Sequence, residues 1–414
     1  TQQVYNLTDS VIVGRFLGKE ALAAVSASFF IYYFIISLAI GVGSGITVVV
    51  SQRFGARDHD AVRRAFSSFL LFAIVAGAVL SVVGVVGADA FFRLTRTPPE
   101  VMPYALRYFR VYAAGTLFFI LFYSALSILR GIGDSVQPMR FVLATAVLNI
   151  AFDLLFILVF RWDIEGAAAA TVLAQACGVA LAIRHIRRHD LLSLHRQDLV
   201  FDRPLFLQGV RIGIPTGVQQ CAIAIGLVAL LGIVNGFGAD TLTAYGAAGK
   251  IDSIIVQIIL TLAGALSAFC GQNIGAGRFD RVHAGVRFAM LFNVCLCLVV
   301  LAAILAFGRQ MMGAFTEDAD VMAIGQEYLT ILGAVLIFHG ALSILNGAMR
   351  GAGDTFFAMV TGIVSFWLIR IPLATLFSRA WGRVGIWWAI AASITLAFIA
   401  TLIYYRTGRW KRRL

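Results

Sequence analysis

Long apolar runs separated by short polar turns occupy the chain from one end to the other. Most runs hold about 20 residues, enough for a helix to cross a bilayer core of about 30 Å. The predicted spans lie near 1–17, 21–50, 65–88, 104–129, 139–160, 166–184, 205–236, 241–270, 284–307, 321–349, 356–378 and 385–405. The pattern therefore predicts an all-α integral membrane protein with twelve transmembrane helices.

The second half of the chain repeats the first at an offset of 220 residues. Residues 52–56 (QRFGA) return at 272–276 (QNIGA), and residues 130–134 (RGIGD) return at 350–354 (RGAGD). Separate blocks that share one offset indicate a duplicated unit. Because each half holds an even number of spans, both halves enter the membrane from the same side and form a parallel repeat. This organisation is typical of secondary transporters.

The repeat and the spans together predict two six-helix lobes. The N-lobe covers residues 1–184, a polar linker covers 185–204, and the C-lobe covers 205–414 and ends in a basic tail. The first span is shorter than its counterpart near 205–236 and begins at Thr1. We therefore expect that the first helix is truncated and that the protein's own N-terminus is missing from this sequence.

Composition and charge agree with a membrane protein. The chain is 60% hydrophobic and 13% charged, whereas soluble domains are about 25% charged; the mean hydropathy is +0.89. The net charge is +12, and 20 of the 33 Lys and Arg residues fall in alternate loops and in the C-terminal tail. The positive-inside rule places these loops and the C-terminus in the cytoplasm. The charge thus requires no nucleic-acid partner, and the tail is expected to contact anionic membrane lipids.

The motifs of several enzyme classes are missing from the sequence. It contains no Gly-rich phosphate loop, no HExxH pair and no nucleophile elbow, which argues against ATP-driven transport and familiar hydrolase chemistry. The five cysteines lie inside predicted spans without metal-ligand spacing. We predict a protein that is not an enzyme and needs no cofactor beyond a coupling ion.

Ionisable residues inside predicted spans point to function, because burying a charge in a bilayer is costly. Asp9, Asp153 and Thr171 all lie roughly 9–12 Å below the outer face, at about 1.5 Å per residue from the predicted span ends. Asn149 is one turn from Asp153, and Tyr5 is one turn from Asp9. If spans one, five and six are neighbours, these polar groups meet at one level of the N-lobe.

The repeat provides an internal comparison for this cluster. The counterparts of Asp9, Asn149 and Asp153 are Ala229, Ile369 and Leu373. A cluster needed only for folding would more plausibly be kept in both halves, although a structural hydrogen-bond network stays an alternative. Hard oxygen ligands at Asp9, Asn149, Asp153 and Thr171 suit Na⁺. Neighbouring buried carboxylates also favour proton binding, so both H⁺ and Na⁺ stay open.

The second half contains a different set of polar residues within its spans. The candidates for lining a substrate cleft are Gln219, Gln220, Lys250, Asp252, Gln257 and His339. Lys250 and Asp252 are two residues apart and face different ways on a helix, so they either line a cavity or form structural ion pairs with other residues, such as Arg370. His339 is either a proton carrier or a hydrogen-bonded packing residue.

Four segments of the sequence resemble the multidrug and toxic compound extrusion (MATE) family. They are residues 9–18 (DSVIVGRFLG), 51–56 (SQRFGA), 271–276 (GQNIGA) and 349–355 (MRGAGDT), and the resemblance covers essentially the whole chain. It implies two six-helix lobes, a V-shaped central cleft and a monomer in the bacterial inner membrane. It also implies export of organic cations and drugs by H⁺ or Na⁺ antiport.

The resemblance also implies roles for individual residues. Asp9, Asn149, Asp153 and Thr171 match the N-lobe cation site of the family's prokaryotic members. Some members carry further acids in spans seven and ten, where this chain has no mid-span acid. That departure favours the subgroup resembling DNA-damage-inducible F proteins and argues against a C-lobe cation site. Two other interpretations are a flippase for lipid-linked sugars from the same superfamily and a non-transporting membrane scaffold.

Overall fold

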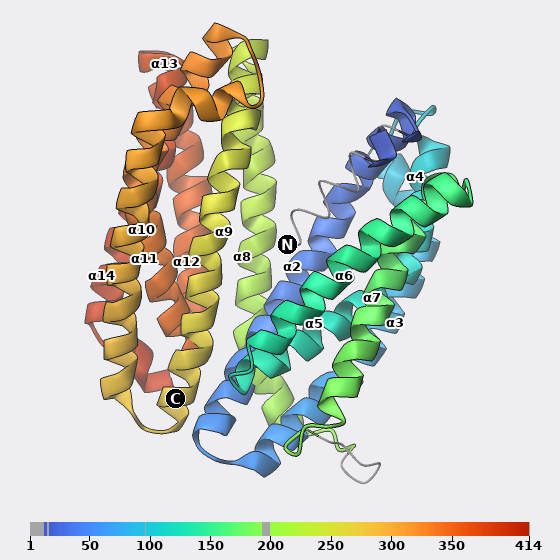
Figure 1. The fold of residues 1–414 in the computed structure, drawn as a ribbon. Helices are drawn as coiled ribbons and strands as arrows, with labels where there is room; N and C mark the ends of the chain where they lie inside the picture. Colours follow the sequence, from blue (N-terminus) through green and yellow to red (C-terminus); the bar gives the residue numbers. More distant parts are fainter. Residues whose placement is uncertain (1–11, 15, 96, 193–198, 414) are drawn as a thin grey trace. The chain divides into compact units, whose positions relative to one another are not determined.

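The computed structural model describes residues 12–14, 16–95, 97–192 and 199–413, and this part of the chain folds into long helices (Figure 1). In the first half these are α2 (Lys19–Gly55), α3 (His59–Leu94), α4 (Met102–Ala114), α5 (Thr116–Gly131), α6 (Val136–Leu154), the π-helix η1 (Leu155–Val159) and α7 (Ile164–Ile186). Then follow α8 (Arg203–Asn235), α9 (Ala239–Gly275), α10 (Phe279–Gly313), α11 (Ala319–Gly351), α12 (Phe356–Ile363), the π-helix η3 (Val364–Arg370), α13 (Ile371–Trp381), α14 (Arg383–Arg406) and the 3₁₀-helix η4 (Arg409–Arg413).

The predicted spans correspond to these helices. Within the described residues, ten helices are long and apolar enough to cross a membrane, and the bent pair α4 and α5 adds an eleventh. The remaining predicted span, near 1–17, lies mostly outside the described residues. The described chain therefore agrees with the predicted all-helical membrane fold.

The duplication is visible in the helix ends and in the turns. The offset of 220 residues carries α2 (Lys19–Gly55) onto α9 (Ala239–Gly275) at both ends. It also carries Gly18, with φ 91°, onto Gly238, with φ 91°. Such positive φ angles favour glycine, and here each glycine precedes a long helix. The two halves are thus built from one repeated structural plan.

The chain separates into two compact units, Thr1–Gly213 and Ile214–Leu414. In the first unit, α2 packs against α5, α6 packs against α7, and α3 packs against both α4 and α5. In the second unit, α11 packs against α9, α10 and α14. The core of the second unit contains Trp387, which is fully buried and stacks on Tyr245 at a centroid distance of 5.8 Å.

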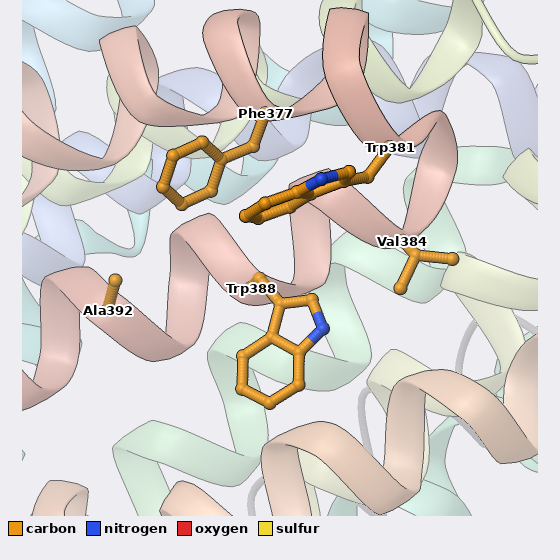
Figure 2. Close-up of a pocket in the computed structure, with 5 residues that line it drawn as sticks. All are labelled: Phe377, Trp381, Val384, Trp388 and Ala392. Atoms are coloured by element: carbon orange, nitrogen blue, oxygen red, sulfur yellow. The ribbon is translucent and has the colours of Figure 1, made fainter.

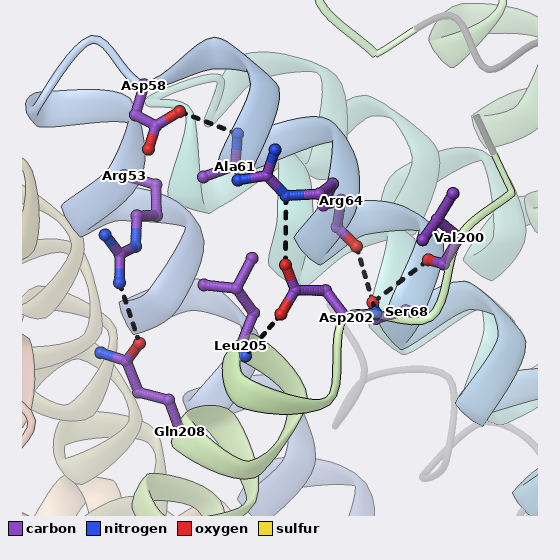
Figure 3. Close-up of polar contacts among 9 residues, drawn as sticks. All are labelled: Arg53, Asp58, Ala61, Arg64, Ser68, Val200, Asp202, Leu205 and Gln208. Atoms are coloured by element: carbon purple, nitrogen blue, oxygen red, sulfur yellow. Dashed lines mark hydrogen bonds and ion pairs between the residues drawn. The ribbon is translucent and has the colours of Figure 1, made fainter.

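The segment before α8 is anchored on α3 of the first unit (Figure 3). The Asp202 carboxylate accepts a hydrogen bond from the Leu205 backbone N–H at 3.1 Å and caps the start of α8. The same carboxylate pairs with Arg64 at 3.1 Å, and Ser68 Oγ accepts from the Asp202 backbone N–H at 2.8 Å. These contacts fix the connection between the repeats to the first unit. We call this end, with loops 56–58 and 132–135, the arginine-rich end.

The fourth predicted span bends by 46° at Gly115, between α4 and α5. A Cβ atom at Gly115 would overlap the Val172 side chain of α7, so glycine allows α7 to approach at the bend. The counterpart of Gly115 in the second unit is Val335, inside the uninterrupted helix α11. The break is therefore a feature of the first unit.

Candidate functional site

Asn149 and Thr171 meet inside the first unit. Asn149 Nδ2 donates a hydrogen bond of 3.2 Å to Thr171 Oγ1, which joins α6 to α7. Thr171 Oγ1 in turn donates to the Ala167 carbonyl at 3.3 Å. The two side chains are 2% and 5% exposed. Asn149 Oδ1 accepts no hydrogen bond from a described residue, so a buried acceptor oxygen is available at this contact.

Asp153 lies one helical turn beyond Asn149 on α6 and is fully buried. Residues four apart share a helix face, so the carboxylate belongs to the same face as the Asn149 amide. The helix then changes to the π-helical turn η1, starting at Leu155. Such turns are frequent at functional sites because they alter the direction of the side chains around them.

The described part of the first span lies beside the fifth and sixth spans. Ile12 and Val13 belong to one buried cluster with Ile157 of η1 and with Ala167 and Ala168 of α7. Spans one, five and six therefore share one buried cluster at these residues, which is the arrangement on which the predicted site depends. Asp9 and Tyr5, the remaining members of the predicted cation site, lie outside the described residues.

The structure adds two polar residues that sequence reasoning missed. Thr145 lies one turn before Asn149 on α6, and Gln175 lies one turn after Thr171 on α7; each side chain is 7% exposed. The spacing of four residues from known candidates could have identified both. The buried polar face of α6 and α7 is thus longer than the predicted site.

An ion pair joins α4 to the start of α7 at the end of the unit opposite to the arginine-rich end. Arg107 pairs with Asp163 at 3.0 Å and with Glu165. In the second unit the counterparts Glu327 and Arg383 face each other at 4.0 Å. The repeat therefore keeps an opposite-charge pair at this place but exchanges the two signs.

The substrate-cleft candidates of the second unit occupy several places. Gln219 donates from Nε2 to the Ala358 carbonyl at 2.8 Å and ties α8 to α12. Lys250 is exposed, and its ammonium lies 5.9 Å from the centre of the Phe315 ring. Gln257 is exposed on α9, and Gln220 is partly buried on α8. Their role as cleft residues stays a prediction.

Asp252 and His339 share one electrostatic neighbour. The Arg370 guanidinium, at the end of η3, interacts electrostatically with the Asp252 carboxylate on α9 and with His339 on α11. Tyr245 and Tyr328 also lie within electrostatic range of Arg370. Electrostatic interactions thus connect Arg370 of η3 with groups on α9 and α11.

Neither a metal-ligand cluster nor the pocket in the second unit adds an ionisable site among the described residues. No group of three His, Cys, Asp or Glu side chains suited to a metal ion occurs among the described residues. A pocket of about 340 Å³ in the second unit is lined by Phe377, Trp381, Val384, Trp388 and Ala392 (Figure 2). Its lining is apolar and contains none of the predicted site residues.

Known proteins of one family are similar to this chain along most of its length. The family model described as MatE matches residues 1–155 and 215–376. The probable multidrug resistance protein YpnP of Bacillus subtilis (strain 168) is 31% identical over 99% of this chain and 92% of its own length. YoeA of the same organism, also described as a probable multidrug resistance protein, is 28% identical over 100% of this chain and 91% of its own length.

Solved structures agree with the fold. A crystal structure of MATE in the bent conformation is similar with a TM-score of 0.93 at 24% identity, covering 100% of this chain and 92% of that chain. The described helices therefore fit the twelve-helix, two-lobe fold of these transporters. The two-lobed membrane fold predicted from the repeat is confirmed at this level.

Proposed function

Because the chain belongs to the MatE family of multidrug and toxic compound extrusion transporters, we propose that it is a secondary active multidrug exporter. It exchanges organic cations and amphipathic drugs for H⁺ or Na⁺ across the bacterial inner membrane, with the arginine-rich end and the C-terminus in the cytoplasm. The relatives are described as multidrug resistance proteins, which supports this class of substrate.

The observation that carries the proposal is the one-sided polar cluster of the first unit. Asn149, Asp153 and Thr171 are buried on adjacent helices. Their counterparts in the second unit are Ile369, Leu373 and Ala391. A buried carboxylate in a membrane span is costly, and a fold-stabilising network would serve both repeats equally well. We therefore assign the cation site to the first unit, with Asp9 and Tyr5 as its further members.

The chemistry of the cluster suits a small cation. Carboxylate, amide and hydroxyl oxygens are ligands for Na⁺, and a buried carboxylate can also take up a proton. Asn149 Oδ1 supplies an acceptor that no described residue occupies. Thr171 holds the amide by accepting from Nδ2, which orients Oδ1 away from that contact. These residues would thus present several oxygens to one bound ion.

Coupling follows if cation and drug favour different conformations. A cation that binds the outward-open state more tightly shifts the protein toward that state, and a drug that binds the inward-open state does the reverse. The coupling free energy is reciprocal, so each ligand weakens the binding of the other. Alternation between the two states then converts an inward cation gradient into outward drug movement.

Ethidium transport tests the proposal. Cells that produce the protein should accumulate less ethidium than cells with an empty vector, and proton and sodium ionophores applied separately should identify the coupling ion. Purified protein in liposomes should then move ethidium only when the corresponding gradient is imposed. Ethidium movement that is unaffected by either gradient would contradict secondary active transport.

A further inference from the structure

The second unit contains a fixed positive charge in the middle of a membrane span. Arg370 lies well inside the span Phe356–Trp381, and an arginine at the centre of a transmembrane helix is costly. Its counterpart in the first unit is Ile150, so the shared fold does not require a charge there. An intramembrane guanidinium kept at this cost points to a specific role.

The guanidinium is held on its Nε edge and on one face. Arg370 Nε donates to Ser393 Oγ at 2.9 Å, and the guanidinium carbon lies 4.3 Å from the centre of the Phe366 ring. The backbone carbonyl of Ser393 also accepts from Ser365 Oγ at 2.9 Å, which ties η3 to α14. These contacts fix the position of the guanidinium. Its other edge, which carries the two Nη atoms, takes part in neither contact.

The Nη edge has no direct partner in the described part of the chain. Neither Nη atom donates a hydrogen bond to a described residue, and no described carboxylate lies within 4.0 Å of the guanidinium. Both Nη atoms lack a hydrogen-bond partner among the described residues, but neither is one of the fully buried polar atoms. A rigid pair of parallel N–H groups matches the two oxygens of a carboxylate.

An opposite charge stands within electrostatic range but not in contact. Asp252 on α9 acts on Arg370 through space, and its oxygens accept no hydrogen bond from a described residue. Tyr245 lies two helical turns before Asp252 on α9, and its ring meets that of Tyr328 at 5.7 Å. The surroundings of the two charges therefore include aromatic rings.

We propose that Arg370 and Asp252 recognise zwitterionic aromatic amphiphiles: the Arg370 Nη edge binds the substrate's carboxylate, and Asp252 pairs with its cationic group. This assignment deepens the proposed export function and rests on it for the identity of the transported molecules. In this arrangement a zwitterion neutralises both intramembrane charges, whereas a simple organic cation neutralises only Asp252. The site therefore favours the zwitterion over the corresponding cation.

The matched dyes rhodamine B and rhodamine B ethyl ester test this proposal. Rhodamine B carries a cationic xanthene and a carboxylate, and the ester differs by masking the carboxylate. Fluorescence anisotropy with the purified full-length protein, in detergent and without an ion gradient, measures the affinity for each dye. Wild-type protein should bind rhodamine B more tightly than the ester by about tenfold, as expected for one charge-assisted bidentate contact. Equal affinity for the two dyes would overturn the proposal.

Two variants test which residues are responsible for the preference for rhodamine B over its ester. Arg370→Gln should weaken rhodamine B binding by about tenfold and leave ester binding nearly unchanged, whereas Asp252→Asn should weaken both dyes. Arg379→Gln, which removes an exposed arginine from the same span, is the matched control and should change neither affinity. If Arg370→Gln weakens both dyes equally, or weakens neither, Arg370 is not a carboxylate receptor.

The assay is independent of the coupling mechanism. The preference of wild-type protein for the acid over the ester needs no variant to fold and no gradient to act. Gradient-driven ethidium export without this preference would contradict the zwitterion site but not the export function. A clear preference for the acid in a protein that moves no dye under any gradient would contradict the export function but not the zwitterion site.

Discussion

Asn149 on α6 donates a 3.2 Å hydrogen bond from Nδ2 to the hydroxyl of Thr171 on α7. This contact links two membrane spans through buried polar groups, one helical turn from the fully buried Asp153. At the same two places the second unit has Ile369 and Ala391, which cannot make the bond. The difference between the repeats therefore lies in chemistry placed on a common scaffold.

Replacement of Thr171 by valine tests the value of this contact. The variant keeps the side-chain shape but removes the acceptor, so the buried Asn149 amide loses a partner. The free energy of unfolding should fall by about 1–3 kcal/mol. Chemical denaturation in detergent measures the change, and Thr171→Ser, which keeps the hydroxyl, should stay close to wild type. Equal loss in both variants would mean that the methyl group, rather than the bond, matters.

The exchanged ion pairs allow a charge-swap experiment. Arg107→Glu should lower the thermal unfolding temperature, because it places a third acid beside Asp163 and Glu165. The double variant Arg107→Glu with Asp163→Arg copies the polarity of Glu327 and Arg383 in the second unit and should recover part of the loss. Since these side chains are partly exposed, each effect should stay within about 1 kcal/mol. A double variant that is less stable than the single one would contradict the equivalence of the two pairs.

The repeated Gly-x-Gly-Asp loops supply another comparison between the units. Asp354 is fully buried and accepts a 2.6 Å hydrogen bond from Tyr404, whereas Asp134 faces His185 at 3.2 Å and is partly exposed. Tyr404→Phe removes one hydroxyl but keeps the ring stacked on Phe357. It should cost about 1.5–3 kcal/mol of stability, as for a hydrogen bond to a charged group.

The control for this prediction is His185→Phe, which removes the weaker, partly exposed contact to Asp134. Its effect on the unfolding midpoint, measured under the same denaturant conditions, should be smaller than that of Tyr404→Phe. If the histidine variant is the less stable of the two, burial does not govern the strength of these loop contacts.

Close backbone contact in the first unit predicts a strong effect of a small substitution. A Cβ atom at Gly45 of α2 would overlap the backbone carbonyl of Gly209 at the start of α8. Backbone cannot move aside as a flexible side chain can, so Gly45→Ala should reduce the yield of monodisperse protein and its unfolding temperature. The matched variant Gly264→Ala on α9 meets no atom within 4 Å and should behave like wild type or better. Gel filtration and thermal unfolding compare the two variants.

Much of the fold was predictable because membrane helices and duplication leave strong patterns. The apolar runs gave the described spans, and the offset of 220 residues reappears in the ends of α2 and α9. The bend at Gly115 was not predicted. A glycine in a membrane helix is common, and only the structure shows that Val172 of α7 packs closely against this one at the bend.

The candidate site was predictable in part. Thr171 was placed at the level of Asp153 by counting residues from the span ends, and Asn149 by its position one turn from Asp153. The structure brings Asn149 and Thr171 into contact. Thr145 and Gln175 were missed because hydroxyl and amide side chains within a span stand out less than carboxylates do. The π-helical turns η1 and η3 could not be predicted either, since no local residue pattern distinguishes them from continued α-helix.

Gradient-driven ethidium efflux by Asp153→Asn in liposomes is the most direct test of the central assignment. The substitution keeps the size of the side chain but removes its charge, and Asp89→Asn on α3, where the carboxylate is 40% exposed, is the matched control. We expect Asp153→Asn to fold like wild type, by gel filtration and unfolding temperature, and to show no efflux under an imposed H⁺ or Na⁺ gradient. The control should retain full efflux. Full gradient-driven efflux by folded Asp153→Asn protein would contradict the assignment of coupling to the first unit.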